Sequence, residues 1–257
     1  SVSLKHRMDV SANHTATHLI HYCLRQISNN QAKQAGSYVG PDRLRFDFLY
    51  PGQIDQEAIE KLELQVNEII FENYPVKIEQ MSYQQAVSNG AVALFTEKYG
   101  KTVRVVRTGD FHSELCGGIH VSRTSEIGIF RIISFSSIGE NLKRIEAVTR
   151  ENAYQWFRKR WEILYQASNL LKTNPENLAS SIIKLKKQVQ ELEEKIETIL
   201  EKATTDIPST LKKNSKNIVI KGYDATLMAG RVDGLTTDQL GKIADTVSSE
   251  ANKLIIL

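Results

Sequence analysis

Two histidines near the start of the chain have the spacing of a shared metal site. His14 and His18 are four residues apart in NHTATHLIHYCLRQI, which has the apolar periodicity of a helix. Their imidazoles would therefore project from one helical face about a turn apart, close enough to share an ion. The adjacent glutamate of an HExxH zinc-protease helix is absent, so the pattern brings no general base and argues against a peptidase.

A second pair lies farther along the chain, in ELCGGIHV, where Cys116 and His120 flank two glycines. Gly117 and Gly118 favour a tight turn in which the backbone approaches a ligand closely. Two histidines from a helix with a cysteine and a histidine from a loop form a four-ligand set of the kind that zinc prefers. The alternative is a buried thiol, the commonest state of a free cysteine, among scattered histidines.

The remaining histidines and the second cysteine receive other assignments. His21 follows the helical pair by three residues and lies on nearly the same face, so it is the main competitor for a place in the ligand set. His6 and His112 have no paired spacing, and we expect them at the surface. Cys23 falls on the apolar face of the helix, and we expect it in the core.

The elements that must position these residues follow from hydrophobic periodicity and capping signals. Asn13 is a suitable N-cap for a helix over residues 14–27, and residues 56–74 fit a second helix that ends before a proline. Apolar alternation and runs rich in Val, Ile and Phe predict strands at residues 44–50, 76–79, 102–107, 127–135 and 144–148. This order predicts an α+β domain with a mixed or antiparallel sheet over residues 1–150.

A helical arm is predicted over residues 151–205. Asn174 and Pro175 restart a helix in which apolar residues recur at alternating steps of four and three, the pattern of a coiled-coil seam. The seam residues are Leu178, Ile182, Leu185, Val189, Leu192, Ile196 and Ile199. The arm either packs on the preceding helix as an antiparallel hairpin or pairs with a second copy of the chain in a dimer.

The last part of the chain, residues 206–257, has the pattern of an α/β domain that is cut short. The chain is basic at Lys212, Lys213, Lys216 and Lys221, around a strand-like NIVIKGYDA. A helix is predicted over residues 237–253, and the final LIIL is typical of a strand that is beginning. A dimer contact could also form in this domain.

Composition narrows the class of protein. The 257 residues are 41% hydrophobic, and no apolar run approaches the ~18 residues needed to cross a bilayer, so no membrane partner is expected. Two cysteines cannot form a disulfide framework, which favours a reducing, cytoplasmic location. A net charge of +3 permits local contact with nucleic acid without requiring it. Because the chain begins at Ser1 without a signal peptide or initiator methionine, we expect it to be part of a longer protein.

Several segments resemble, in the same order, the editing domain of bacterial-type alanyl-tRNA synthetases. They are NHTATHLIHYCLRQ, KQAGSYVGPDRLRFDF, GAVALFTEKYG, VRVVRTGDFHSELCGGIHVSRTSEIGIFRIIS and RIEAVT. The arm and GYDATLMAGRVDGLTTDQLGKIAD resemble the linker helices and the start of the C-terminal domain in that family. The HxxxH and CxxxH pairs are shared with free-standing alanyl-tRNA editing proteins and with threonyl-tRNA synthetases, so the flanking sequence carries the narrower assignment.

The resemblance implies hydrolysis of tRNA(Ala) that has been wrongly loaded with serine or glycine. The zinc ligands of the family, one ion per chain, match His14, His18, Cys116 and His120. A glutamine of its editing pocket matches Gln34, the candidate catalytic residue. The family usually has threonine where this chain has Ile119, so a contact of that hydroxyl is not carried over. Nothing in the chain resembles the part that activates alanine with ATP, so ATP binding is expected only in sequence that precedes this chain.

A second pocket of this kind has a physical reason. An alanine pocket rejects glycine weakly because one missing methyl is worth only about 1–3 kcal/mol, and it excludes the hydroxyl of serine little better. Zinc could anchor the substrate or activate water; four protein ligands favour closed coordination, in which Gln34 and the amides near Gly117 and Gly118 orient substrate and water. The candidates for holding the tRNA backbone are Arg43, Arg45, Lys143 and Arg144.

Two other functions compete with an editing esterase. A free-standing editing protein should carry a barrel-like segment before the HxxxH helix, whereas only thirteen residues precede His14. In a non-catalytic module, zinc would tie the fold together while the chain binds and spaces tRNA. Release of serine from seryl-tRNA(Ala) separates the esterase from this module.

Overall fold

The structure is a computed structural model that describes residues 2–93, 100–231, 235–248 and 253–256. It has an α+β fold, which confirms the fold class expected from the sequence. The chain divides into two compact units, Ser1–Ile163 and Leu164–Leu257, and each is described by itself. Residues 94–99, within the motif GAVALFTEKYG, lie outside the described residues. Among the helices that are described, none combines the length and apolarity of a membrane-spanning segment.

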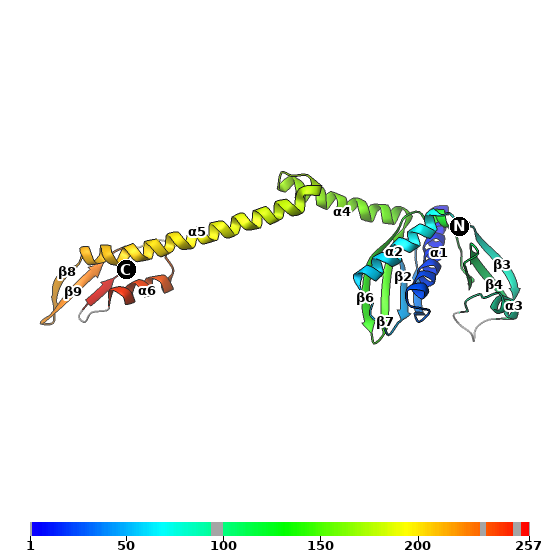
Figure 1. Ribbon diagram of the computed structural model, residues 1–257, viewed down its shortest axis with the longest axis horizontal. Coiled ribbons are helices and arrows are strands. Elements are labelled where there is room, and N and C mark those ends of the chain that lie inside the picture. The colour runs from blue at the N-terminus through cyan, green and yellow to red at the C-terminus, as the bar shows by residue number, and fades with distance from the viewer. Residues whose placement is uncertain (1, 94–99, 232–234, 249–252, 257) are drawn as a thin grey trace. The chain divides into compact units, whose positions relative to one another are not determined.

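The first unit is built on a four-stranded antiparallel sheet in the order β1-β2-β7-β6 (Figure 1). The strands are β1 (Lys33–Val39), β2 (Leu44–Leu49), β6 (Phe130–Gly139) and β7 (Leu142–Thr149). Helices α1 (Leu4–Ile27) and α2 (Gln56–Phe71) pack on one face, because alternate residues of the central strands point toward them. Phe46 and its cross-strand partner Ile145 are fully buried in this core.

A smaller antiparallel sheet lies on the other side of α1 and carries the second half of the site (Figure 1). Its order is β3 (Val76–Ser82), β4 (Thr102–Thr108) and β5 (His112–Leu115), with the short helix α3 (Tyr83–Ser88) beside it and the turn η1 (Thr124–Ile127) farther along the chain. Val103, Val105 and Leu115 form a core of their own with Ala86. Strand β5, the turn η1 and helix α3 were not expected from the sequence.

Helix α1 begins ten residues earlier than capping signals predict, at Leu4, so the expectation that Asn13 caps it is wrong. Ser3 is the N-cap, and its side chain accepts a hydrogen bond from the His6 amide. Asn13 lies inside the helix and is fully buried; its Nδ2 donates to the Gly40 carbonyl at 2.8 Å and its Oδ1 accepts from Thr149 Oγ1 at 2.8 Å. Tertiary hydrogen bonds, rather than a cap, explain this asparagine.

The second unit follows from helix α4 (Arg150–Leu170), which crosses the boundary between the units. A turn, η2 (Pro175–Asn177), leads into α5 (Leu178–Lys213), and a mixed sheet of β8 (Lys216–Ile220), β9 (Tyr223–Ala229) and β10 (Lys253–Ile256) packs with α6 (Thr237–Val247). The predicted helix over residues 237–253 is therefore too long, because α6 ends at Val247 and β10 begins at Lys253. Residues 254–256 of the predicted strand LIIL lie in β10, and residue 257 is outside the described residues. Among its described residues, Leu211, Met228, Ile243 and Val247 form a buried hydrophobic cluster.

Helix α5 continues through Pro208, where the sequence suggested an end near residue 205. Proline costs about 3 kcal/mol inside a helix, but Leu211 in the following turn is buried in the core of the unit and offsets that cost. Seam residues from Leu185 to Ile199 are exposed. Pairing of this seam in a hairpin or a dimer stays a prediction, as does the division of the chain at residues 150 and 205.

Candidate metal centre

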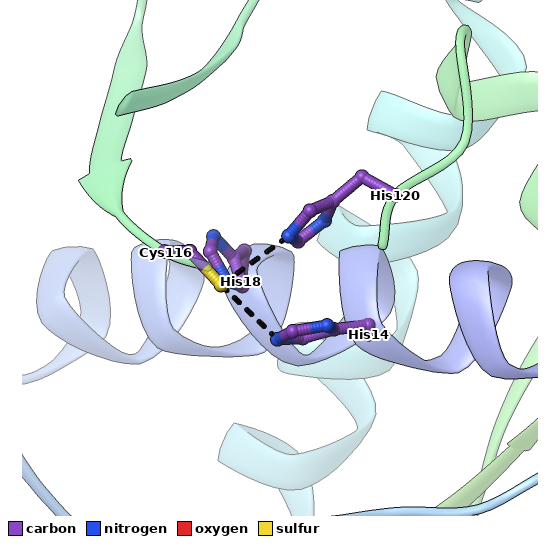
Figure 2. A group of neighbouring side chains, drawn as sticks. All are labelled: His14, His18, Cys116 and His120. Carbon is purple, nitrogen blue, oxygen red and sulfur yellow. Dashed lines mark hydrogen bonds between the residues drawn. The ribbon is translucent and has the colours of Figure 1, made fainter. Parts of the chain in front are cut away.

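Helix α1 and the loop after β5 bring the four predicted ligands together (Figure 2). His14 and His18 come from one face of α1, and Cys116 and His120 come from the loop that crosses it. One ligand atom from each residue can be chosen so that all four lie within 4.8 Å of one another. Residues more than 90 positions apart in sequence thus form one cluster, and the spacing of the two pairs predicted its membership.

The distances within the cluster suit a tetrahedral ion. Cys116 Sγ lies 3.3 Å from His14 Nε2 and 3.4 Å from His120 Nε2. Bonds of about 2.0 Å to nitrogen and 2.3 Å to sulfur place neighbouring ligand atoms of a tetrahedral zinc about 3.5 Å apart. The His18 ring is buried, whereas His14, Cys116 and His120 are half-buried. The residues therefore fit Zn²⁺ both in donor type and in separation.

The surroundings of Cys116 favour the thiolate form of its side chain, which is the form that binds a metal. Burial alone would raise the pKa of this thiol, but hydrogen bonds with His120, His14 and His18 outweigh burial and lower the pKa to about 3. The Gly118 amide also donates to Sγ, at 3.4 Å. Since only the thiolate binds a metal, Cys116 presents the required form at neutral pH.

Thr15 determines which ring nitrogen of His120 carries the proton. Thr15 Oγ1 donates its one proton to the Ser11 carbonyl at 3.0 Å, so toward His120 Nδ1, 3.1 Å away, it can only accept. Nδ1 therefore carries the ring proton, and the Nε2 lone pair faces the thiolate. Burial lowers the pKa of His120 to about 4, so the ring is neutral at neutral pH.

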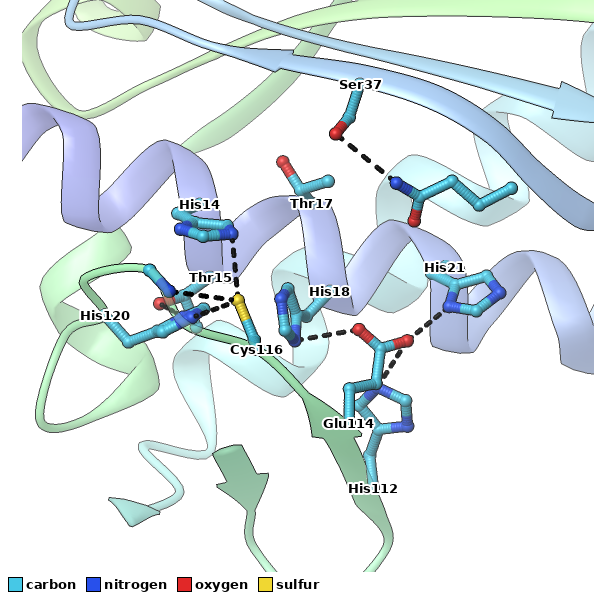
Figure 3. Close-up of polar contacts among 12 residues, drawn as sticks. His14, Thr15, Thr17, His18, His21, Ser37, His112, Glu114, Cys116 and His120 are labelled. Atoms are coloured by element: carbon cyan, nitrogen blue, oxygen red, sulfur yellow. Dashed lines mark hydrogen bonds and ion pairs between the residues drawn. The ribbon is translucent and has the colours of Figure 1, made fainter. Parts of the chain in front are cut away.

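Glu114 is buried and lies on the side of the His18 ring away from Cys116 (Figure 3). Glu114 Oε2 lies 2.9 Å from His18 Nδ1, and the same carboxylate contacts His21 Nδ1 and lies 3.4 Å from His112 Nε2. Burial lowers the pKa of His18, but the charge of Glu114 and the contact with Cys116 raise it to about 10. Although burial also acts to raise the pKa of Glu114, the His18 charge holds it well below its usual value.

These contacts correct the assignment of one histidine and place another. His112, expected at the surface, is 7% exposed, because every residue of β5 is enclosed. His21 is also buried and pairs with Glu114, outside the four-ligand cluster. Cys23 is 2% exposed, as expected of a core thiol, and His6 is exposed.

The two glycines of the loop differ in what surrounds them. A Cβ on Gly118 would overlap the His14 ring, so only glycine allows the loop to pass this close to the ligand. A Cβ on Gly117 would meet nothing within 4 Å. Arg104 on β4 donates to the carbonyls of Cys116 and Gly118 and so fixes the path of the loop.

Comparison with known proteins agrees with this geometry. A family described as the threonyl and alanyl tRNA synthetase second additional domain matches residues 103–146, which include Cys116 and His120. Alanine-tRNA ligase of Haemophilus influenzae (strain PittGG) is 38% identical over 255 residues, 99% of this chain and 29% of the relative. That of Geobacillus kaustophilus (strain HTA426) is 40% identical over 251 residues, 98% of this chain and 28% of the relative. That of Lysinibacillus sphaericus (strain C3-41) is 45% identical over 203 residues, 78% and 22%.

The chain is homologous to one segment of the alanine-tRNA ligases. It spans less than a third of the length of these relatives, at most 29% of those named here. The resemblance inferred from the sequence motifs is thereby confirmed.

Gln34 lies on the face of β1 that packs on α1. Gln34 is opposite Phe48 and Ser37 is opposite Phe46, so both share the face that packs on α1. An irregularity between Gln34 and Gly36 allows two residues three apart to share that face, and Gln34 Nε2 donates to Ser37 Oγ at 3.3 Å. Figure 3 shows Ser37 projecting from β1 toward α1 and Thr17.

The basic residues proposed for tRNA binding lie apart from the cluster. Arg45 and Arg144 point from the opposite face of the sheet, where Arg144 forms two bonds, of 2.7 and 2.9 Å, with Asp47. Arg43 Nε lies 3.3 Å from Glu146, and Lys143 lies opposite Phe48 on β7. Their contact with tRNA stays a prediction.

Three residues of the site were missed by sequence reasoning: Thr15, Arg104 and Glu114. Thr15 and Glu114 act across 105 and 93–96 positions of sequence, so no spacing rule could pair them with their partners. One usable signal was the position of Glu114 itself, which lies in β5 two residues before the candidate ligand Cys116.

Proposed function

We propose that this chain is the editing part of an alanine-tRNA ligase and hydrolyses the ester of serine or glycine on tRNA(Ala) at a zinc-containing site. The observation that carries the proposal is the convergence of a thiolate and three imidazoles at zinc-like separations, 3.3 and 3.4 Å where they are hydrogen-bonded. The homology to alanine-tRNA ligases over nearly the whole chain supports the substrate class.

The residues around the cluster have roles that their chemistry supports. When bound, zinc supplies a fixed positive charge that can hold and polarise a substrate group. Gln34 lies on the face of β1 that packs on α1. Its side-chain amide can both donate a hydrogen bond to and accept one from a serine hydroxyl or a water molecule. Gly117 is exposed at the edge of the cluster, so its amide is available to orient an ester, whereas the Gly118 amide already holds Cys116.

The wider function belongs to the same proposal. The parent ligase would attach alanine to tRNA(Ala) with ATP in a part that this chain does not resemble, and the editing part would work beside it in the cytoplasm. Arg45 and Arg144 would contact the phosphate backbone from the far face of the sheet, away from the ester. Arg43 would do so from just before the start of β2, and Lys143, opposite Phe48, from the face that packs on α1.

A non-catalytic role is the second candidate, because all four positions of a tetrahedral ion would be filled by protein. Closed coordination of this kind is typical of structural zinc. In that case the centre would join α1 to the β5 loop, and the chain would bind tRNA(Ala) without hydrolysing it.

Single-turnover deacylation of seryl-tRNA(Ala) and glycyl-tRNA(Ala) tests the proposal. We expect release of the amino acid well above the uncatalysed rate, reduced at least 100-fold by His14→Ala. His6→Ala is the matched control, since His6 lies exposed on the same helix, and it should retain the wild-type rate. If zinc-loaded protein binds tRNA(Ala) but releases serine only at the uncatalysed rate, the non-catalytic role is correct.

A further inference from the structure

Behind the ligand set lies a buried carboxylate that the proposed reaction does not use. The Glu114 side chain is 1% exposed. It contacts three imidazoles: His18 through Nδ1 at 2.9 Å, His21 through Nδ1, and His112 through Nε2 at 3.4 Å. Figure 3 shows His18 between Cys116 on one side and Glu114 on the other.

The contact with His18 determines which of its nitrogens can face an ion. An ionised carboxylate only accepts hydrogen bonds, so His18 Nδ1 must carry a proton where it meets Glu114. The other nitrogen, Nε2, is then the one that can exchange its proton for an ion on the side of Cys116. Without this contact the buried ring could adopt the other tautomer or turn about its χ2 angle, and neither would present Nε2 correctly.

The charges of the centre also balance when Glu114 is included. One divalent cation with the Cys116 thiolate leaves a net charge of +1 in a site where His18 is buried. The Glu114 carboxylate, one imidazole away, brings the sum to zero. A buried carboxylate is costly unless it is paired, and here a cation beyond His18 is available to pair with it.

We propose that Glu114 is a positioning residue of the metal centre: it holds His18 by Nδ1 so that Nε2 faces the ion, while His21 and His112 hold the carboxylate in place. This inference rests on the proposed zinc site. His21 and His112 thereby have a role outside the ligand set, which explains why two further histidines are enclosed beside it.

The zinc affinity of Glu114→Gln tests this role, because glutamine has the same shape and still accepts a hydrogen bond but carries no charge. Competition with a chromophoric chelator should show zinc bound about 10- to 100-fold more weakly than in wild type. In the cobalt-substituted protein, the visible absorption bands should shift because His18 becomes a less basic ligand once its hydrogen-bond partner carries no charge. A change of overall stability alone would move neither measurement.

Asp9→Asn is the matched control. Asp9 is also a buried carboxylate associated with α1, but its partners are Lys5 and Arg150 at 2.9 and 3.1 Å, away from the ligands. The same change of charge at Asp9 should lower stability and leave zinc affinity unchanged. His21→Gln should weaken zinc less than Glu114→Gln, since it removes one of the residues that hold the carboxylate.

The outcomes separate this inference from the zinc site itself. If wild type binds no zinc, both are overturned. If wild type binds one zinc and Glu114→Gln binds it equally tightly, only the positioning role is overturned. Two zinc ions in wild type with one lost in Glu114→Gln would make Glu114 a ligand of a second site with His18 and His112, which also overturns it.

A measurement on wild type covers the case in which Glu114→Gln does not fold. Long-range ¹H–¹⁵N correlation spectra of the zinc-loaded protein report which nitrogen of His18 carries the proton. We expect the proton on Nδ1 and the metal on Nε2; a proton on Nε2 would overturn the proposal.

Discussion

At the scale of single residues, the loop glycines show how closely the backbone must approach a ligand. Gly118 passes beside the His14 ring, and its amide donates to Cys116 Sγ at 3.4 Å. A methyl group at this position would force either the ring or the loop to move, and the ring cannot move without leaving the cluster. Gly117, one position earlier, has open space around its Cα and imposes no such limit.

We therefore expect Gly118→Ala to weaken zinc binding at least 10-fold and Gly117→Ala to leave it unchanged. The two variants add the same methyl group to adjacent positions of one loop, so general effects of removing a glycine cancel between them. Zinc content after dialysis against a competing chelator measures the difference. Equal losses in both variants would contradict the geometry of the loop.

The two cysteines should differ in reactivity, with Cys116 reactive toward alkylation and Cys23 unreactive. Hydrogen bonds lower the pKa of Cys116 to about 3, whereas burial raises that of Cys23 to about 12. Between pH 5 and 8, Cys116 is thus already a thiolate, and its alkylation rate should change little; the rate of a thiol with a pKa near 8.5 rises about tenfold per pH unit. The thiolate of Cys116 would be lost only as pH falls toward 3.

Alkylation of chelator-treated protein with iodoacetamide, followed by mass spectrometry, checks this prediction. Cys116 should be labelled and Cys23 should not, and added zinc should protect Cys116. A rate that rises tenfold per pH unit at Cys116 would show that its imidazole neighbours do not stabilise the thiolate.

At the scale of elements, α1 is the part on which the whole site depends. It contributes two ligands and Thr15, and it lies against both sheets of the first unit. Asn13 ties this helix to the β1-β2 connection through the Gly40 carbonyl and to the end of β7 through Thr149. Both bonds are buried, so loss of the side chain leaves two polar groups without a partner.

Asn13→Ala should lower the free energy of unfolding by about 2–3 kcal/mol, measured by urea denaturation. Asn152→Ala is the control, since half-buried Asn152 makes one bond of 2.9 Å to the Pro41 carbonyl in the same connection. It should cost about 1 kcal/mol or less. A loss at Asn13 no larger than at Asn152 would contradict the assigned role.

Elements with a strong period were predictable from sequence, and contacts between elements were not. The amphipathic pattern located α2, which begins at Gln56 as expected, and alternation located β2 and β7 to within two residues. The start of α1 was missed because Asn13 has the chemistry of a cap, and only the tertiary partners Gly40 and Thr149 reveal its use. In the same way, spacing predicted that His14, His18, Cys116 and His120 would cluster, whereas the contact of Glu114 with His18 becomes visible only once β5 lies against α1.

At the scale of the whole molecule, the two compact units have separate cores. The first contains α1, the large sheet and the metal centre, and the second depends on a small cluster around Leu211, Met228, Ile243 and Val247. Since zinc would bind the folded first unit alone, its free energy of binding should stabilise that unit alone. The second unit has little buried apolar surface and should unfold at a lower temperature.

Calorimetry of the full chain should therefore show two transitions, of which only the upper one responds to zinc. At a free zinc concentration about 1,000 times the dissociation constant, the linkage is worth about 4 kcal/mol, which corresponds to an increase of about 10 °C for a unit of this size. Leu211→Ala should lower the other transition without moving the zinc-dependent one, because Leu211 is buried in the second core. A single transition that shifts as a whole with zinc would mean that the two units unfold together, and that the metal centre stabilises residues far outside its own core.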